Sequence, residues 1–402
     1  MANEQLGLLR LQEAMDLLGV SRATIDRWRK DKQLPHIKIG KEIWIDKDKL
    51  QAWVRLHARE SGVGVSNPMQ DSKKRVVTVG YQSGAALLWS TLIIKQRGIF
   101  EDELERLSPS TAYRVNWLHA PNGMELVEKL IGGHVHIASV GDYPLIAGRA
   151  LSLLLPRFQP MFLAFDGKAR NGGGLSLVVP ARKAVHRPEE LSGAVISTVG
   201  NSSASYRLRE WMNAYGLATD PIVHRTMRDC LNGILEAKVG ASFMWEPYPS
   251  LARSLGAGVS LPYEGIGGDY LTGLMADGHW ARDNEEVVIA YLKAHLRAHK
   301  FMRQEPAKSA AIISEASGVP IAVAAGVISG IRWDASLYSK DLQTLHRLSD
   351  GQADWLPTAK ITENRAGFEL GNPYLQYAAQ ALRLPKLPDA PLPGDWSQES
   401  IY

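Results

Sequence analysis

The sequence predicts an α/β protein in which a small separate domain precedes a larger body. From Arg75 onward, short runs of apolar and β-branched residues alternate with amphipathic helical segments, the pattern of strands joined by crossover helices. Before that point, residues 60–74 lose this periodicity and are rich in glycine, serine and charge, as in a linker. We therefore expect a domain over 1–59, a linker over 60–74 and the body over 75–402.

Composition limits the class of protein. The 402 residues carry a formal net charge of +4, 45% are hydrophobic and 22% are charged, which excludes a disordered chain. Charged residues interrupt the first 20 positions, so we expect no secretory signal, and no apolar run approaches the roughly 20 residues that span a bilayer. We expect a cytoplasmic protein without a membrane segment. The single cysteine, Cys230, excludes an intramolecular disulfide and a thiolate metal cluster, and we interpret it as a buried small hydrophobe.

The N-terminal domain has the pattern of a winged helix-turn-helix. Apolar residues recur with helical spacing over 8–20, and Ser21 is placed to cap a second helix directly afterwards. Residues 36–46 then alternate like two strands around the turn Gly40-Lys41, and a further helix is expected over 48–56. Three helices and a strand pair, or wing, are thus predicted.

A family resemblance supports this interpretation. The residues that carry it are Glu13-Ala14, Leu17 to Ile25, Arg27-Trp28, Leu34-Pro35, Lys38 to Gly40 and Ile43 to Ile45. On these residues the segment resembles the excisionase and MerR-type winged-helix family, and departs from its pattern at Met15 and Gln33. The resemblance implies that the partner is double-stranded DNA.

Charge is concentrated in the same segment. Between Ser21 and Lys41 the net charge is +5, whereas the other 381 residues together carry −1. Basic side chains on a recognition helix and wing would contact phosphates, with Arg27 or Arg22 reaching a base edge. The alternative is a solvated charged face on a protein-interaction module. The candidate DNA contacts are Arg22, Thr24, Arg27, Arg29, Lys30, Lys38 and Lys41.

The body carries a second resemblance. Its motifs, in chain order, lie at 79–85, 95–100, 126–144, 189–198, 200–206, 234–248 and 267–271. Their order resembles the solute-binding proteins of ABC importers in the nitrate, taurine and alkanesulfonate class. That resemblance implies a two-lobe periplasmic-binding-protein type II fold with a ligand cleft between the lobes. Lobe one would hold 75–168 and 269–348, lobe two 169–268, and a proline-rich tail would follow.

Three strand-to-helix turns in the body end in small polar residues. Backbone N–H groups at such turns point outward at positive helix ends, which favours binding of a small anion at the carboxyl ends of the strands. Each turn alone could be an ordinary helix cap, and for Asp142 we favour the cap. The candidate ligand contacts at these turns are Gln82, Ser83, Gly84, Gly141, Asp142, Ser202 and Ser203.

Three further residues complete the candidate ligand site. Trp245 and Glu246 follow a strand and would place an aromatic face and a carboxylate at the mouth of the cleft. Glu246 could accept an ammonium group or hold the hinge through backbone N–H groups, and we favour the structural role. Arg170 could pair with a sulfonate or carboxylate, or be a solvated loop residue.

The sequence lacks the common catalytic and nucleotide-binding motifs. His134 and His136 share one strand face without a third ligand, so we expect no metal site, no cofactor and no enzyme activity. We predict a cytoplasmic one-component transcriptional regulator that binds a small organic anion, with a sulfonate favoured, and that forms at least a dimer on DNA. The alternatives are an enzyme like the thiamine-pyrimidine synthases, which share the fold, and a DNA-binding accessory factor with a vestigial cleft.

Overall fold

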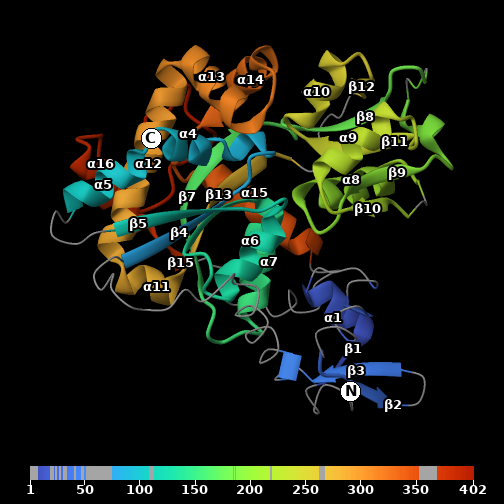
Figure 1. Cartoon of the computed structure of the whole chain (residues 1–402), viewed down its shortest axis with the longest axis horizontal. Coiled ribbons are helices and arrows are strands. Elements are labelled where there is room, and N and C mark those ends of the chain that lie inside the picture. The colour runs from blue at the N-terminus through green and yellow to red at the C-terminus, as the bar shows by residue number, and fades with distance from the viewer. Residues whose placement is uncertain are drawn as a thin grey trace.

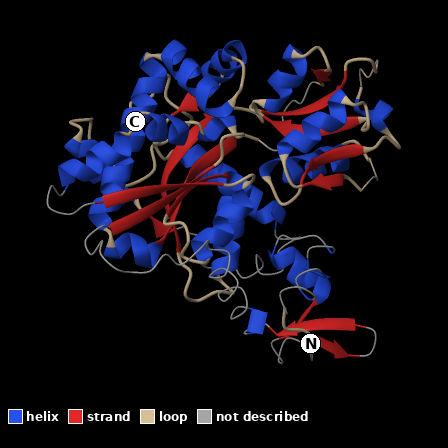
Figure 2. Ribbon diagram, in the orientation of Figure 1, coloured by secondary structure: helices blue, strands red, loops and turns tan. Residues whose placement is uncertain are grey.

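The computed structural model describes residues 8–18, 22, 25–26, 29, 34–39, 42–46, 49–50, 75–107, 113–183, 185, 187–217, 220–261, 268–352 and 369–402. Within these ranges the strands form three sheets, of three, five and seven strands (Figures 1 and 2). No helix of the described ranges has the length and apolar character needed to cross a membrane.

The N-terminal sheet contains the predicted wing. Strands β2 (Ile37–Ile39) and β3 (Glu42–Asp46) pair antiparallel. The sequence analysis predicted that the first helix begins at residue 8, and that prediction was wrong. Leu8–Arg10 form strand β1 on the other side of β3, and helix α1 (Leu11–Leu18) begins only where Glu13 accepts a hydrogen bond from the Arg10 amide. Buried residues of this part include Leu11, Ala14, Ile25, Leu34 and Ile45.

The seven-stranded sheet forms the centre of what we call the first lobe. Strands β4, β5 and β6 run parallel to one another, whereas β13 is antiparallel to both β6 and β7. The strand order is β14-β7-β13-β6-β4-β5, and β15 adds to β7. The strands are β4 (Arg75–Tyr81), β5 (Tyr113–His119), β6 (Ile137–Gly141), β7 (Pro160–Ala169), β13 (Tyr270–Asp277), β14 (Arg332–Trp333) and β15 (Glu369–Leu370).

Helices cover this sheet for local reasons that the sequence makes visible. In α6 the side chain of Asn122 caps the amide of Glu125, and Leu126 and Leu130 are buried on one face. The helices of the first lobe are η2 (Ala86–Leu88), α4 (Ser90–Gln96), α5 (Ile99–Leu107), α6 (Gly123–Ile131), α7 (Asp142–Ser152), α11 (Gly278–Asp283), α12 (Glu285–Gln304), α13 (Pro306–Ser317), α14 (Ile321–Ser329), α15 (Ser339–Gln352) and α16 (Asn372–Ala381).

The five-stranded sheet forms the second lobe, with strand order β10-β9-β11-β8-β12. Its strands are β8 (Leu175–Pro180), β9 (Ile196–Val199), β10 (Ile222–His224), β11 (Ala241–Trp245) and β12 (Gly258–Ser260). Its helices are η3 (Pro188–Leu191), α8 (Ser203–Ala214), α9 (Met227–Leu235) and α10 (Tyr248–Ser254). Cys230 is buried on α9, as expected for a small hydrophobe, and burial raises the pKa of its thiol to about 12.

The chain crosses between the lobes twice. After β7 it reaches β8 through residues 170–174, where Gly174 adopts a φ of +80°. It returns from β12 to β13, which lies in the middle of the seven-stranded sheet (Figure 1). The C-terminal segment then packs back on the first lobe, where Trp396 and Tyr402 are buried. The first lobe is therefore built from segments on both sides of the second.

Candidate functional site

The two lobes touch where β4 and β11 end. The indole Nε1 of Trp245 donates to the carbonyl oxygen of Gly84 at 2.8 Å. The amide of Ala86 donates to the carbonyl oxygen of Glu246, also at 2.8 Å. The structure thus brings Trp245 and Glu246 of the second lobe against the predicted turn Gln82-Ser83-Gly84 of the first.

The other two predicted turns also meet. Helix α8 begins with a capping box, in which the side chains of Ser202 and Ser205 each accept a hydrogen bond from the backbone amide of the other. The next side chain, Ser203, accepts at 3.3 Å from the amide of Tyr143, which lies in the first turn of α7. Two helix N-termini, one from each lobe, therefore lie side by side.

Asp142 and Arg207 form an ion pair across this contact. The two guanidinium nitrogens of Arg207 donate to the two carboxylate oxygens of Asp142 at 2.7 and 3.2 Å, and neither side chain is exposed. Arg207 also donates to the carbonyl oxygen of Asp269, and Asp142 also accepts from the Tyr143 amide. Both Asp142 oxygens are thus used inside the protein, so this residue joins the lobes and offers no open position to a ligand in this structure.

Two glycines allow the lobes to approach. A Cβ atom on Gly84 would lie 2.7 Å from the hydroxyl of Tyr248, at the start of α10. A Cβ atom on Gly141 would lie 2.7 Å from Ser203 Oγ and 3.3 Å from the hydroxyl of Tyr270. Any larger residue at either position would force the opposing side chain to move.

Sequence analysis did not find Tyr248, Tyr270 or Arg207. Both tyrosines lie inside the motifs at 234–248 and 267–271, at the start of α10 and of β13, but no pattern in the sequence places their hydroxyls at the lobe contact. Arg207 did carry a signal, because helical spacing from Ala204 and Leu208 to Trp211 places it on the apolar face of α8. An arginine in that place requires a buried acidic partner.

Ser83 has a partner in its own lobe. Its hydroxyl lies 2.9 Å from Nε2 of His119, at the end of β5. Burial, together with the nearby charge of Lys95, lowers the pKa of His119, which favours the neutral imidazole. Gln82 is buried, and its side-chain Nε2 donates to the carbonyl oxygen of Ser139 on β6 at 3.2 Å. This bond fixes the turn Gln82-Ser83-Gly84 against the sheet.

Glu246 and Arg170 have protein partners. The Glu246 carboxylate accepts hydrogen bonds from the amide and hydroxyl of Ser250 in α10, while its burial raises the pKa. Arg170 is half exposed, donates to Asp395 at 2.9 Å and lies over the ring of Trp396. Neither contact of Arg170 involves the gathered turns, so the structure places it apart from them.

The remaining groups at the lobe contact are mostly neutral hydrogen-bonding groups. They are the hydroxyls of Ser83, Ser203, Tyr248 and Tyr270, with the imidazole of His119 beside them. Two guanidinium groups among the described residues pair with carboxylates across the lobes, Arg207 with Asp142 and the more exposed Arg225 with Glu125. Such a set suits a weakly basic oxyanion better than a strongly charged one, because several neutral donors can share its charge.

The N-terminal candidates are only partly described. Arg22 is exposed and pairs with Asp26 at 3.2 Å, and Lys38 is exposed on β2. Arg29 was expected on an exposed face, but its side chain is only 21% exposed and holds Asp26 from the other side at 2.7 Å. Four of the candidate DNA contacts lie outside the described residues: Thr24, Arg27, Lys30 and Lys41.

Comparisons with known proteins agree with this architecture. Residues 8–55 match the family model of the helix-turn-helix domain. A protein of Bacillus subtilis (strain 168) named as an aliphatic sulfonates-binding protein is 24% identical over 260 residues, which is 63% of this chain and 74% of the relative.

Two solved structures share the fold of the body. The alkanesulfonate-binding protein of Xanthomonas axonopodis pv. citri, bound to MOPS, is 19% identical, with a TM-score of 0.58 over 70% of this chain and 93% of that one. The periplasmic nitrate-binding protein of Synechocystis is 15% identical, with a TM-score of 0.60 over 79% of this chain and 92% of that one.

These findings define the class of the protein. It is an α/β protein that joins an N-terminal helix-turn-helix domain to a body with the periplasmic-binding-protein type II fold. Within that class, the body is similar in sequence and fold to the sulfonate- and nitrate-class solute-binding proteins of ABC importers. Both resemblances drawn from the sequence are confirmed.

Proposed function

We propose that this protein is a cytoplasmic one-component transcriptional regulator that binds operator DNA and senses a small organic anion. The observation that carries the proposal is the presence of a helix-turn-helix domain and a solute-binding fold in one chain. A DNA-binding domain works where the DNA is, whereas an importer's binding protein captures solute outside the membrane. A body fused to a DNA-binding domain is better suited to detecting a solute than to delivering one.

The ligand class follows from the chemistry at the lobe contact. Neutral hydroxyls and the N-termini of α7 and α8 favour a compact, weakly basic oxyanion. The relatives are named for binding sulfonates or nitrate, which supports the same class. We propose an alkanesulfonate or taurine-like sulfonate.

The mechanism we propose is a shift between open and closed lobes. The ion pair of Asp142 with Arg207 and the bond from Trp245 to Gly84 exist only while the lobes touch. A ligand that contacts both lobes favours the closed form, and only that differential affinity can change DNA binding. We also propose at least a dimer, because a single winged helix offers little surface for specific binding.

The test measures coupling between DNA and ligand. Random duplex DNA is selected on the purified full-length protein, and a fluorescent copy of the enriched sequence is titrated with and without alkanesulfonates, taurine, nitrate and bicarbonate. A sulfonate should change the DNA affinity by about fivefold or more. Light scattering on the same samples reports the oligomeric state.

The rival functions predict different results. Ligand binding with unchanged DNA affinity, or DNA binding without any ligand-induced rise in Tm, would contradict the sensor and favour an accessory factor with a vestigial cleft. Chemical turnover of a bound compound, followed by NMR, would favour an enzyme on this fold.

A further inference from the structure

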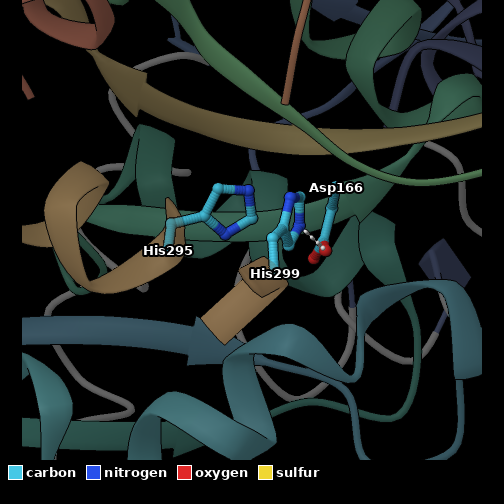
Figure 3. Close-up of side chains that lie close together, drawn as sticks. All are labelled: Asp166, His295 and His299. Carbon is cyan, nitrogen blue, oxygen red and sulfur yellow. Dashed lines mark hydrogen bonds and ion pairs between the residues drawn. The ribbon is translucent and has the colours of Figure 1, made fainter. Parts of the chain in front are cut away.

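Three potential metal ligands lie together in the interior of the first lobe, away from the lobe contact. Asp166 lies on β7, and His295 and His299 lie on α12 (Figure 3). All three side chains are completely buried. One possible ligand atom from each residue lies within 4.8 Å of the other two. Among the described residues, no other group of three or more His, Cys, Asp or Glu side chains meets this distance.

The residue types and spacing suit zinc. Two histidines four residues apart project from the same face of a helix, an arrangement that zinc sites use often, and a carboxylate from an adjacent strand is a common third ligand. In α12 the two imidazole centroids are 4.1 Å apart. His299 Nε2 lies 3.1 Å from Asp166 Oδ1.

Neighbouring groups orient these side chains as they do in zinc sites. His295 Nε2 lies 2.8 Å from the carbonyl oxygen of Phe165, which can only accept, so this nitrogen carries the proton and Nδ1 keeps its lone pair. The hydroxyls of Ser90 and Ser139 donate to Asp166 Oδ2 at 2.8 and 3.1 Å. Oδ1 is the oxygen left facing His299.

The charge balance also calls for a cation. Asp166 forms no ion pair with a lysine or arginine within the described ranges, and the nearby Lys168 directs its ammonium to Asp341 instead. A completely buried carboxylate is costly unless a cation or hydrogen bonds compensate it.

We propose that Asp166, His295 and His299 bind a structural zinc ion in the first lobe. The ion would neutralise Asp166 and tie β7 to α12. Because all three ligands are buried, the ion would enter during folding and exchange slowly afterwards.

The first experiment measures metal content. Untagged protein is produced in zinc-supplemented medium, dialysed against EDTA and analysed by inductively coupled plasma mass spectrometry. We expect about one zinc per chain in the native protein and in the control variant His346→Gln, which changes an exposed histidine. His299→Gln and His295→Gln should lose the zinc. A native protein without bound metal, or equal zinc in these two variants, would overturn the proposal.

The second experiment does not depend on a variant that folds. Native protein is unfolded in guanidinium with EDTA, freed of both and refolded with or without one equivalent of zinc. Zinc should raise the Tm by about 5 °C or more. Cobalt(II) in its place should give visible absorption stronger than that of the aqueous cobalt(II) ion. Equal Tm values and no cobalt spectrum would identify the cluster as a hydrogen-bonded network only.

Discussion

Arg207 on α8 holds both carboxylate oxygens of Asp142 on α7, and this pair joins the two lobes without exposing either charge. A buried pair of this kind adds little net stability compared with apolar residues, but it is expensive to break on one side. Because the two residues lie on different lobes, the pair can form only when the lobes are closed.

Replacing Arg207 should strand a buried carboxylate. We expect Arg207→Met to lower the free energy of unfolding by about 3 kcal/mol in urea titrations, because Asp142 loses its partner. Arg187→Met, which breaks the exposed pair with Glu190, should cost less than about 1 kcal/mol. Adding Asp142→Asn to Arg207→Met should recover part of the loss. Similar losses for the two single arginine variants would contradict the role given to the interlobe pair.

A substitution at Gly84 tests whether closure of the lobes requires that position 84 carry no side chain. Gly84→Ala places a Cβ atom 2.7 Å from the hydroxyl of Tyr248, so ligand affinity measured by calorimetry should fall at least about tenfold. Gly84→Ala with Tyr248→Phe should restore much of it. Gly326→Ala is the control, because nothing lies within 4 Å of that position. Unchanged affinity in Gly84→Ala would mean that the lobes need not meet here.

The adjacent residues Ser202 and Ser203 should separate stability from binding. Ser202 is the cap of α8, so Ser202→Ala should cost about 1 kcal/mol of stability. Ser203 contacts the opposite lobe, so Ser203→Ala should reduce the ligand-induced rise in Tm more than it lowers the Tm without ligand. Thermal shifts with and without ligand measure both effects. A reversed order would assign the ligand contact to Ser202.

The N-terminal cations should act through phosphates. Arg22→Ala and Lys38→Ala remove exposed charges, and each should lower the slope of log affinity against log salt by about one if it contacts a phosphate. Lys308→Ala, an exposed charge on α13, is the control and should change nothing. Fluorescence anisotropy over a salt series makes the measurement. Slopes equal to that of the unaltered protein would remove both residues from the DNA contact.

His136 should make the stability pH-dependent. Its Nδ1 accepts a hydrogen bond from the Thr78 amide at 2.9 Å, and burial lowers its pKa in the folded state. The unfolded chain, with a histidine pKa of about 6.5, therefore binds the proton first, and stability is lost as pH falls below that value. Urea unfolding between pH 8 and 5 should show a shallower loss in His136→Gln. Identical pH profiles would exclude this contribution.

Local patterns were sufficient for much of the fold. The alternation of strands and helices from Arg75 onward was predicted because apolar spacing is a local property, and the strand Arg75–Tyr81 and the helix Gly123–Ile131 follow it. The strand Leu8–Arg10 was missed, since its pairing with β3 depends on residues more than thirty positions away. Its first residue, Leu8, fits the helical spacing of the following apolar residues equally well.

The candidate site was harder to derive than the fold. The turns at Gln82, Gly141 and Ser202 were recognisable as strand ends, and the structure gathers them at the lobe contact. Their opposing partners were not recognisable, because which side chain faces a turn from the other lobe is set by tertiary packing. Asp142 illustrates the difficulty, since a carboxylate at a helix N-terminus has the same sequence pattern whether it caps the helix or binds a distant arginine.

The first lobe is built from segments on both sides of the second, and this order affects how the chain folds while it is being synthesised. Strand β13 lies between β6 and β7 in the sheet, yet it is synthesised only after the whole second lobe. Until it emerges, β6 and β7 have unpaired edges, which are prone to aggregate. We therefore expect the continuous second lobe to fold first during translation, while the first lobe depends on chaperones. Chains truncated just before Tyr270 should aggregate although they contain every strand of the second lobe.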